Sequence, residues 1–165
     1  MSAFLLNPAL FLIGLFGMEA VAYYMHKYVM HGLLWSLHRD HHEPHEGFFE
    51  INDLFGIFFS LPSIVLIYIG VNHHNPPVLW LGLGIAGYGL VYFIFHDVIV
   101  HRRVSTPYRA SSAYMKRIIQ AHWLHHAIRT KEGAVSFGFI YSPPIATLKA
   151  QLRAAREARQ IPASN

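Results

Sequence analysis

The sequence has no cysteine, which excludes disulfides, thiolate-ligated haem, cysteine-ligated iron–sulfur clusters and zinc sites built on thiolates. It is also poor in charge: only 13% of its 165 residues are Asp, Glu, Lys or Arg, against about a quarter in soluble domains. Repeats of low complexity are missing as well, and with 15% aromatic residues this excludes a disordered chain. What remains is a short chain of one domain, residues 1–165, in which 53% of the residues are hydrophobic.

Long runs with little or no charge predict membrane spans. Residues 4–25 contain a single charge, Glu19, and as a helix they would extend for about 33 Å, enough to cross a bilayer. Residues 54–71 and 78–95 are uncharged runs of 18 residues each, and the link between them allows only a tight hairpin. Residues 134–148 are also uncharged but contain two prolines, so we interpret them as interfacial or re-entrant, with a short fourth span as the alternative. The expected fold is an all-α integral membrane helical bundle with three or four transmembrane helices.

The distribution of basic residues predicts the orientation of this bundle. With three spans, segments 26–53 and 96–165 share one side and contain all 13 Lys and Arg residues, whereas residues 1–3 and 72–77 contain none. The positive-inside rule places the basic side in the cytoplasm. The formal net charge of +4 therefore reflects orientation and does not indicate a nucleic-acid partner. The first run lacks a basic segment before it and contains Glu19, so we expect it to stay as an anchor, while the basic tail, 149–165, is a candidate for contact with anionic lipid.

Histidine is the residue that the chain has in excess. There are 13, as many as Lys and Arg together, and ten of them form a pattern that occurs twice. Each half of the chain carries a pair five residues apart, followed by an HxxHH motif. The ten are His26, His31, His38, His41, His42, His96, His101, His122, His125 and His126. A duplicated set on one side of a membrane predicts a metal site, because imidazole binds iron, copper, zinc and nickel well.

Helix geometry indicates how these rings can meet. Positions i, i+3 and i+4 share a helix face, so each HxxHH motif can project three rings together. Residues five apart differ by about 140° on an α-helix, so His26 and His31 either serve two metals or need a local unwinding of the helix. Two metals with five imidazoles each would keep an open position for oxygen or a substrate. We therefore expect a histidine-rich di-metal cap on the cytoplasmic side of the bundle.

The residues around the motifs have simpler interpretations. Some nearby carboxylates are expected to accept hydrogen bonds from metal-bound rings; the candidates are Asp40, Glu43, Glu46, Glu50, Asp53 and Asp97. The simpler alternative makes Asn52 or Asp53 the N-cap of the second span, and leaves Glu43, Glu46 and Glu50 as solvated loop charges. His45 lies outside the pattern and stays undecided. His73 and His74 are expected in a polar turn on the opposite side, and the small residues of 82–87 are expected to allow close helix packing.

The four histidine motifs resemble those of the fatty-acid hydroxylase superfamily of membrane di-iron oxygenases. Other segments resemble the bacterial β-carotene 3-hydroxylases within it; they lie around Met18-Glu19, 26–32, 41–45, 52–54, 135–139 and Pro143-Pro144. The resemblance extends from about Gly14 to Leu152. The histidine motifs alone indicate only the superfamily, since desaturases, sterol hydroxylases and carotenoid ketolases carry related sets.

This resemblance implies two non-haem iron ions held by the ten histidines, with O2 as co-substrate. It implies hydroxylation of the 3 and 3′ carbons of β-ionone rings, from β-carotene through β-cryptoxanthin to zeaxanthin. Electrons would come from a reduced ferredoxin-type partner that is itself supplied by NADPH. We expect the carotenoid to enter from the bilayer of the bacterial inner membrane, and an acidic donor to approach a cytoplasmic face that contains Arg102, Arg103, Lys116 and Arg117.

Other function classes stay open at this point. A carotenoid ketolase, or another lipid hydroxylase or desaturase, would use the same motifs. A haem protein for membrane electron transfer would need two axial histidines per haem and would leave most of the ten unexplained. A metal transporter would carry its ligands near the middle of the bilayer rather than at one interface.

Overall fold

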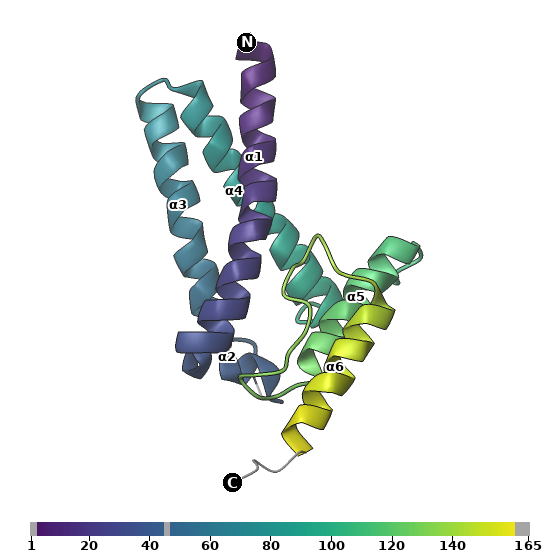
Figure 1. The fold of residues 1–165 in the computed structure, drawn as a ribbon. Coiled ribbons are helices and arrows are strands. Elements are labelled where there is room, and N and C mark those ends of the chain that lie inside the picture. Colours follow the sequence, from purple (N-terminus) through teal and green to yellow (C-terminus); the bar gives the residue numbers. More distant parts are fainter. Residues whose placement is uncertain (1–2, 45–46, 161–165) are drawn as a thin grey trace.

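The computed structural model describes residues 3–44 and 47–160, and all regular structure within these ranges is helical. Its elements in chain order are α1 (Ala3–Tyr24), the π-helix η1 (Met25–Leu33), α2 (Trp35–His42), α3 (Asp53–Asn72), α4 (Pro76–Tyr92), the π-helix η2 (Phe93–Val100), α5 (Ala113–His126) and α6 (Ile145–Gln160). In Figure 1 the long helices α1, α3 and α4 form a stem, and α2, α5 and α6 gather at the end away from the N-terminus. The expected all-α bundle is confirmed.

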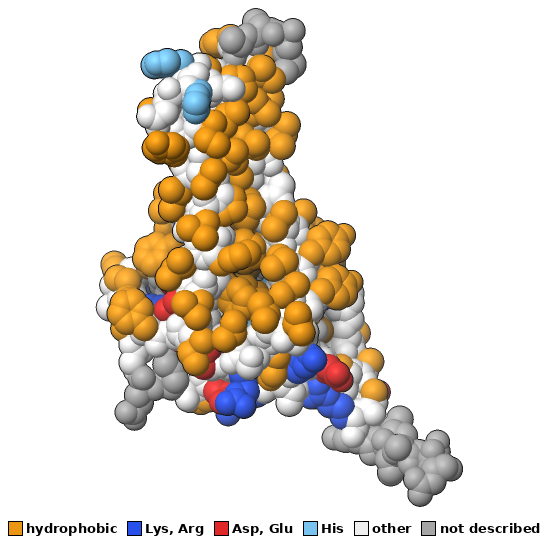
Figure 2. Space-filling view, turned by 90° about the vertical axis from the view of Figure 1, so that its left-hand side faces the viewer, with side chains coloured by type: hydrophobic (Ala, Val, Ile, Leu, Met, Phe, Trp, Pro, Cys, Tyr) orange, Lys and Arg blue, Asp and Glu red, His pale blue; other side chains and the backbone are white. Residues whose placement is uncertain are grey.

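Three helical stretches of the described chain are long and apolar enough to cross a membrane: Phe4–Leu33, Asp53–Asn72 and Pro76–Val100. Large apolar side chains on their outer faces are exposed, for example Phe4 at 84% and Ile57 at 61%. Figure 2 shows hydrophobic side chains covering most of one face, with the charged ones near the end opposite the exposed histidines. Apolar surface on this scale marks contact with lipid or a partner, and its position along three long helices identifies the chain as a membrane protein.

Two spans are longer than the sequence predicts. The first continues from α1 through η1, and the third continues from α4 through η2. The polar residues His26, Lys27 and His96 interrupt the apolar runs, but the backbone stays helical past them. The predicted ends therefore mark where the apolar surface stops, whereas the helices extend further and carry the first histidines of each motif.

The fourth uncharged run does not form a helical span. Within 134–148, residues 134–144 are irregular, and the helix α6 begins only at Ile145. Pro143 and Pro144 explain this, because proline lacks an N–H and keeps the residue before it out of the α region. Val135 and Leu148 instead pack with Ala121 of α5 in a small buried core. The alternative of a short fourth span is wrong, and the interfacial or re-entrant placement stays a prediction.

Glycines set the distance between the first and third spans. A Cβ built on Gly14 would lie 2.6 Å from the carbonyl oxygen of Leu81, and one built on Gly84 would overlap the backbone of Phe11. The backbones of α1 and α4 are thus in direct contact at two levels, which larger residues would prevent. The expectation that the small residues of 82–87 allow close helix packing is confirmed.

Replacing Gly84 by Ala should destabilise the protein by about 1–3 kcal/mol, because the added methyl group forces α1 away from α4. Gly89→Ala is the matched control in the same helix, since nothing lies within 4 Å of its Cβ and alanine is the better helix former. Thermal denaturation of both variants in detergent measures the difference. Equal midpoints for the two variants would contradict the packing argument.

Candidate metal centre

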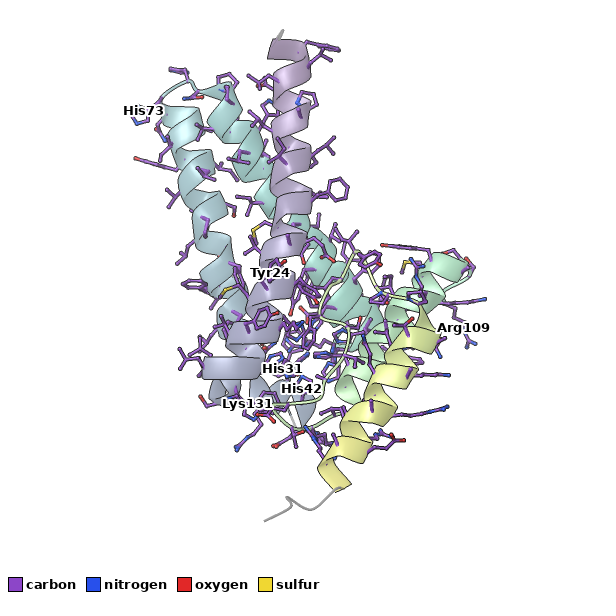
Figure 3. The ribbon with its side chains drawn as sticks, in the orientation of Figure 1. Tyr24, His31, His42, His73, Arg109 and Lys131 are labelled. Atoms are coloured by element: carbon purple, nitrogen blue, oxygen red, sulfur yellow. The ribbon has the colours of Figure 1, made fainter. Side chains whose placement is uncertain are left out.

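The ten histidines of the repeated pattern meet at the end of the bundle where α2 and α5 lie. Figure 3 shows ring nitrogens gathered around His31 and His42, while His73 lies at the opposite end. Eight of the ten are buried, and His101 and His126 are half-buried. The expectation that His73 and His74 form an exposed polar turn away from the cluster is confirmed. His45 and Glu46 lie outside the described residues.

The cluster divides into two groups of five. Site A consists of His26, His31, His38, His42 and His125, and site B consists of His41, His96, His101, His122 and His126. In each group, one nitrogen per ring lies within 4.8 Å of the nitrogens of the other four. Each site therefore takes four rings from one half of the chain and one from the other half. The two crossing residues are His41, which joins site B, and His125, which joins site A, and they occupy the same place in the repeat.

The HxxHH motifs do not project all three rings to one point, as the sequence suggested. His38 and His42 are four residues apart and share site A, whereas His41 turns toward site B. Neighbouring residues on a helix differ by about 100°, so His41 and His42 face different directions even though both lie on the inner side. Each short helix therefore contributes to both sites.

The pairs five residues apart each serve one site, because the helix is locally unwound. His26 and His31 both lie in η1. His96 lies in η2, and His101 follows directly after its end. The N–H of His101 donates to the carbonyl of His96 at 2.9 Å, a hydrogen bond from i+5 to i. A π-turn closes over five residues and so brings residues five apart onto one side. Of the two alternatives, the structure supports local unwinding.

In site A every ring has its outer nitrogen fixed by a neutral oxygen. Four Nδ1 atoms donate to backbone carbonyls: His26 to Phe137 at 3.1 Å, His31 to Lys131 at 3.1 Å, His42 to Ile128 at 2.9 Å and His125 to Val135 at 3.0 Å. The fifth, His38, donates to Oδ1 of Asn52 at 2.6 Å. A neutral imidazole has one N–H, so a proton used at Nδ1 leaves Nε2 with a bare lone pair.

In both sites the Nε2 atoms point at one another. In site A the Nε2 of His38 lies 3.1 Å from that of His26 and 3.2 Å from that of His42. In site B the Nε2 of His122 lies 3.0 Å from that of His101 and 2.9 Å from that of His126. Two nitrogens bound at right angles to a metal at about 2.1 Å are about 3.0 Å apart. Lone pairs that converge at this distance repel unless a cation lies between them, so the donor set fits a metal ion in each site.

In site B two of the five rings have anionic partners. His41 Nδ1 donates to Glu50 at 2.6 Å and His96 Nδ1 donates to Asp97 at 2.8 Å. Arg103 holds these carboxylates in place, with its guanidinium 2.6 Å from Glu50, 2.7 Å from Asp53 and 3.6 Å from Asp97. A carboxylate partner makes a ring a stronger electron donor than a carbonyl partner does. The two sites therefore differ in charge although each has five imidazoles.

Three simpler interpretations of the sequence are corrected here. Glu50 is not a solvated loop charge, since its side chain is only 6% exposed and it contacts His41 and Arg103. Asn52 stands at the N-cap position of α3, but its side chain accepts from His38 rather than capping the helix. Arg103 is 12% exposed and is bound by carboxylates, so it belongs to the interior of the site and not to an open basic face.

Glu19 is a residue whose role the sequence did not assign. Its carboxylate accepts hydrogen bonds from the backbone N–H groups of Phe139, Ile140 and Tyr141, and from the hydroxyl of Tyr88. The signal was present, because a lone ionisable residue inside an apolar span is expensive and is kept for a function. The backbone carbonyls of 128–137 that fix site A have no such signal, since every residue type carries one.

Burial keeps the rings in the neutral form that binds metal. It lowers the pKa of His38 to about 3, and the pKa values of His42 and His101 to about 4. Burial lowers the pKa of His126 to about 2, and nearby imidazoles, including that of His42, lower it in the same direction. Buried His41, His122 and His125 are shifted the same way by the same two causes. At neutral pH these rings are bases ready to bind a cation.

Comparison with known proteins places this site in a family. A sequence profile of the fatty acid hydroxylase family matches residues 11–143. The chain is 46% identical to a protein named "Beta-carotene hydroxylase" from Pantoea ananas, over 93% of this chain and 87% of the relative. Proteins of the same name from Pseudescherichia vulneris and Paracoccus sp. (strain PC1) are 44% and 42% identical, over 90% and 93% of this chain and 84% and 92% of the relatives. No solved structure matches the chain.

The metal-free protein should lose stability as the pH falls from about 6.5 toward 4. The unfolded chain takes up protons at its histidines in this range, whereas the folded chain does not because burial lowers the pKa values of His38 and His101. Since the unfolded state then binds more protons, acid favours it. Thermal denaturation of chelator-treated protein across this pH range measures the effect.

The double variant His38→Gln/His101→Gln should depend less steeply on pH, because two of the responsible groups are gone. His73→Gln, at the exposed turn, is the control and should follow the unmodified protein. If the double variant and the control show the same slope, the buried rings are not the cause of the acid sensitivity.

Proposed function

Because the chain belongs to the fatty acid hydroxylase family, we propose that it hydroxylates the β-ionone rings of β-carotene, with one iron ion in each of the two histidine sites. The observation that carries the proposal is the convergence of five imidazole nitrogens in each site. The relatives that cover most of the chain bear the name of this activity and favour a hydroxylase over a carotenoid ketolase or another lipid hydroxylase. The products are β-cryptoxanthin and then zeaxanthin, through the 3 and 3′ carbons.

The chemistry explains why such a site is needed. An unactivated C–H bond does not yield to acid–base groups, so two bound iron ions would supply the redox chemistry with O2, two electrons and two protons, which gives one hydroxyl group and one water. The protein positions the ring and excludes water from it. Five imidazoles at each ion keep one position open, and neutral ligands leave each ion its full positive charge. Phe137 and Phe139 pack against the histidines and keep this interior apolar.

The position of the site suits a substrate dissolved in the membrane. The histidines lie at the ends of the first and third spans, where the apolar surface gives way to charged side chains. A carotenoid ring can reach this level from the bilayer without crossing water, while its polyene stays beside the spans. A site at one end of the bundle, with five ligands per ion, is unlike a haem protein or a transporter with ligands at mid-membrane. We place the protein in the bacterial inner membrane with this end in the cytoplasm, following the positive-inside rule.

The electron donor that we propose is a reduced ferredoxin-type protein supplied by NADPH. A cavity of about 350 Å³ beside α5 is lined by Arg102, Arg109 and Lys116 together with Tyr108 and Trp123. Its charged side chains are all basic, and Arg102 follows His101 directly in the chain. Complementary charge speeds the encounter with an acidic partner. The docking face is thus built around this cavity, and Arg103, bound inside the site, is not part of it.

Production of the protein in bacteria that accumulate β-carotene tests the reaction. We expect β-cryptoxanthin and zeaxanthin to appear, and we expect His38→Ala to abolish both, because a buried site loses a ligand. His73→Ala, at the opposite end, is the control and should keep its products. Ketone products would identify a ketolase. Unchanged β-carotene in the presence of an active donor would overturn the proposal.

Charge reversal at the cavity tests the donor. Arg109→Glu/Lys116→Glu should raise the KM for reduced ferredoxin about tenfold and weaken the salt dependence of turnover, since steering by opposite charge is lost. Arg153→Glu/Arg156→Glu on the exposed side of α6 makes the same change in net charge away from the cavity and should leave both unchanged. Equal kinetics for the two double variants would remove the cavity from the docking face.

A further inference from the structure

Glu19 is half-buried in the first span, and four groups of the described chain donate hydrogen bonds to its carboxylate. The N–H groups of Phe139, Ile140 and Tyr141 donate to its Oε1 at 2.9, 2.9 and 3.0 Å, and the Tyr88 hydroxyl donates to its Oε2 at 2.8 Å. An ionised carboxylate only accepts, and here each of its oxygens is used. Hydrogen bonds to the charged form are what make such a charge tolerable in apolar surroundings.

The segment that Glu19 holds is the one that fixes site A. We call residues 128–141 the clasp. The clasp provides the four carbonyls that accept from site A, those of Ile128, Lys131, Val135 and Phe137. Glu19 binds the clasp at its far end, two to four residues beyond Phe137. If the far end were free, the carbonyls of Val135 and Phe137 would lose their fixed distance to His125 and His26.

The fit between Glu19 and the clasp is close enough to require a glycine. A Cβ on Gly138 would lie 2.6 Å from Oε1 of Glu19 and 2.9 Å from the carbonyl oxygen of Tyr141. On either side of Gly138, two aromatic rings face the histidines. The ring centre of Phe137 is 5.4 Å from that of His26 and 5.3 Å from that of His125. The Phe139 ring is stacked parallel to His26 with their centres 5.9 Å apart.

Site B does not depend on the clasp in the same way. Two of its rings, His41 and His96, donate from Nδ1 to Glu50 and Asp97, and Arg103 binds both carboxylates. These carboxylates make the two rings more basic than the rings of site A, which face neutral oxygens. Loss of the clasp should therefore weaken one site and spare the other.

We propose that Glu19 is a positioning residue that keeps site A able to bind its metal by anchoring the clasp, so that the two metal ions are held by separate supports. The inference rests on the proposed function only in that both sites bind metal. Site A, with neutral partners on a backbone segment that has no helical structure of its own, is the first to empty. Site B, with carboxylates locked by Arg103, retains its ion.

The test uses the full-length protein in detergent and replaces Glu19 by Gln, which is similar in size but has no negative charge, so its hydrogen bonds with the three backbone N–H groups are weaker. We expect the metal content after dialysis against a graded series of chelators to fall from about two ions per chain to about one. The affinity of the weaker site should fall about 10–100-fold, the usual effect of losing support behind a metal ligand. Hydrogen exchange of the 139–141 amides should become faster at the same time.

Two variants serve as controls for fold and for site. Tyr88→Phe removes one donor to the same carboxylate without touching the clasp, so it should keep two ions. Glu50→Gln weakens the other support, and combining it with Glu19→Gln should remove both ions. If Glu19→Gln does not fold, Gly138→Ala tests whether separating Glu19 from the clasp weakens site A. Its methyl group displaces the clasp from Glu19, while the sequence of the span is unchanged.

The outcomes separate this inference from the function on which it rests. Two ions bound with unchanged affinity in Glu19→Gln would overturn the role of Glu19, as would equal weakening of both sites in a folded variant. If the unmodified protein binds fewer than two ions or makes no hydroxylated carotenoid, the proposed function fails instead. Loss of one ion in Glu19→Gln and in Gly138→Ala, with two in Tyr88→Phe, supports the inference.

Discussion

The hydrogen bond from Nδ1 of each site A histidine to a neutral oxygen is the interaction on which the metal centre depends. It uses the only proton of a neutral ring and so leaves Nε2 as a lone pair. It also fixes the ring, because the oxygen lies on a rigid backbone segment or on Asn52. Five lone pairs held toward one point have no favourable state without a cation. The hydrogen bonds on the side of each ring that faces away from the metal therefore fix the ligands in advance, and this favours metal binding.

The π-helices place the rings that these bonds then hold. An α-helix would point His26 and His31 in different directions. The wider turn of a π-helix brings them to the same side, although π-helical geometry is rare in proteins. Gly32, with φ −126° and ψ −112°, interrupts the helical backbone near the end of η1, shortly before α2 begins at Trp35. The same solution occurs at His96 and His101, where the i+5 hydrogen bond is formed. The repeat in the sequence is thus a repeat of local backbone structure as well as of ligands.

Much of this arrangement can be predicted from the sequence, and there are physical reasons why the other features cannot. Apolar length predicts the three spans, and spacing predicts that ten histidines gather at one end, because both depend on local periodicity. The exchange of His41 and His125 between the sites is not predictable, since it depends on how two helices face each other across the bundle. The acceptors at 128–137 are backbone atoms and leave no residue signature. In the sequence Arg103 does not differ from other basic residues near the membrane, and only the structure shows Glu50, Asp53 and Asp97 around it.

Unequal support of the two sites follows from where each one lies. Site B has charged side chains beside it, from η2 and from the residues that lead into α3, and Arg103 balances three of their carboxylates. Site A lies beneath an extended segment that returns toward the first span, where a further charge would be costly, so backbone carbonyls are used instead. A backbone segment without helical structure must be tied at both ends to hold such carbonyls still. In this chain one end continues from α5, and the other end is bound by the single carboxylate of the first span.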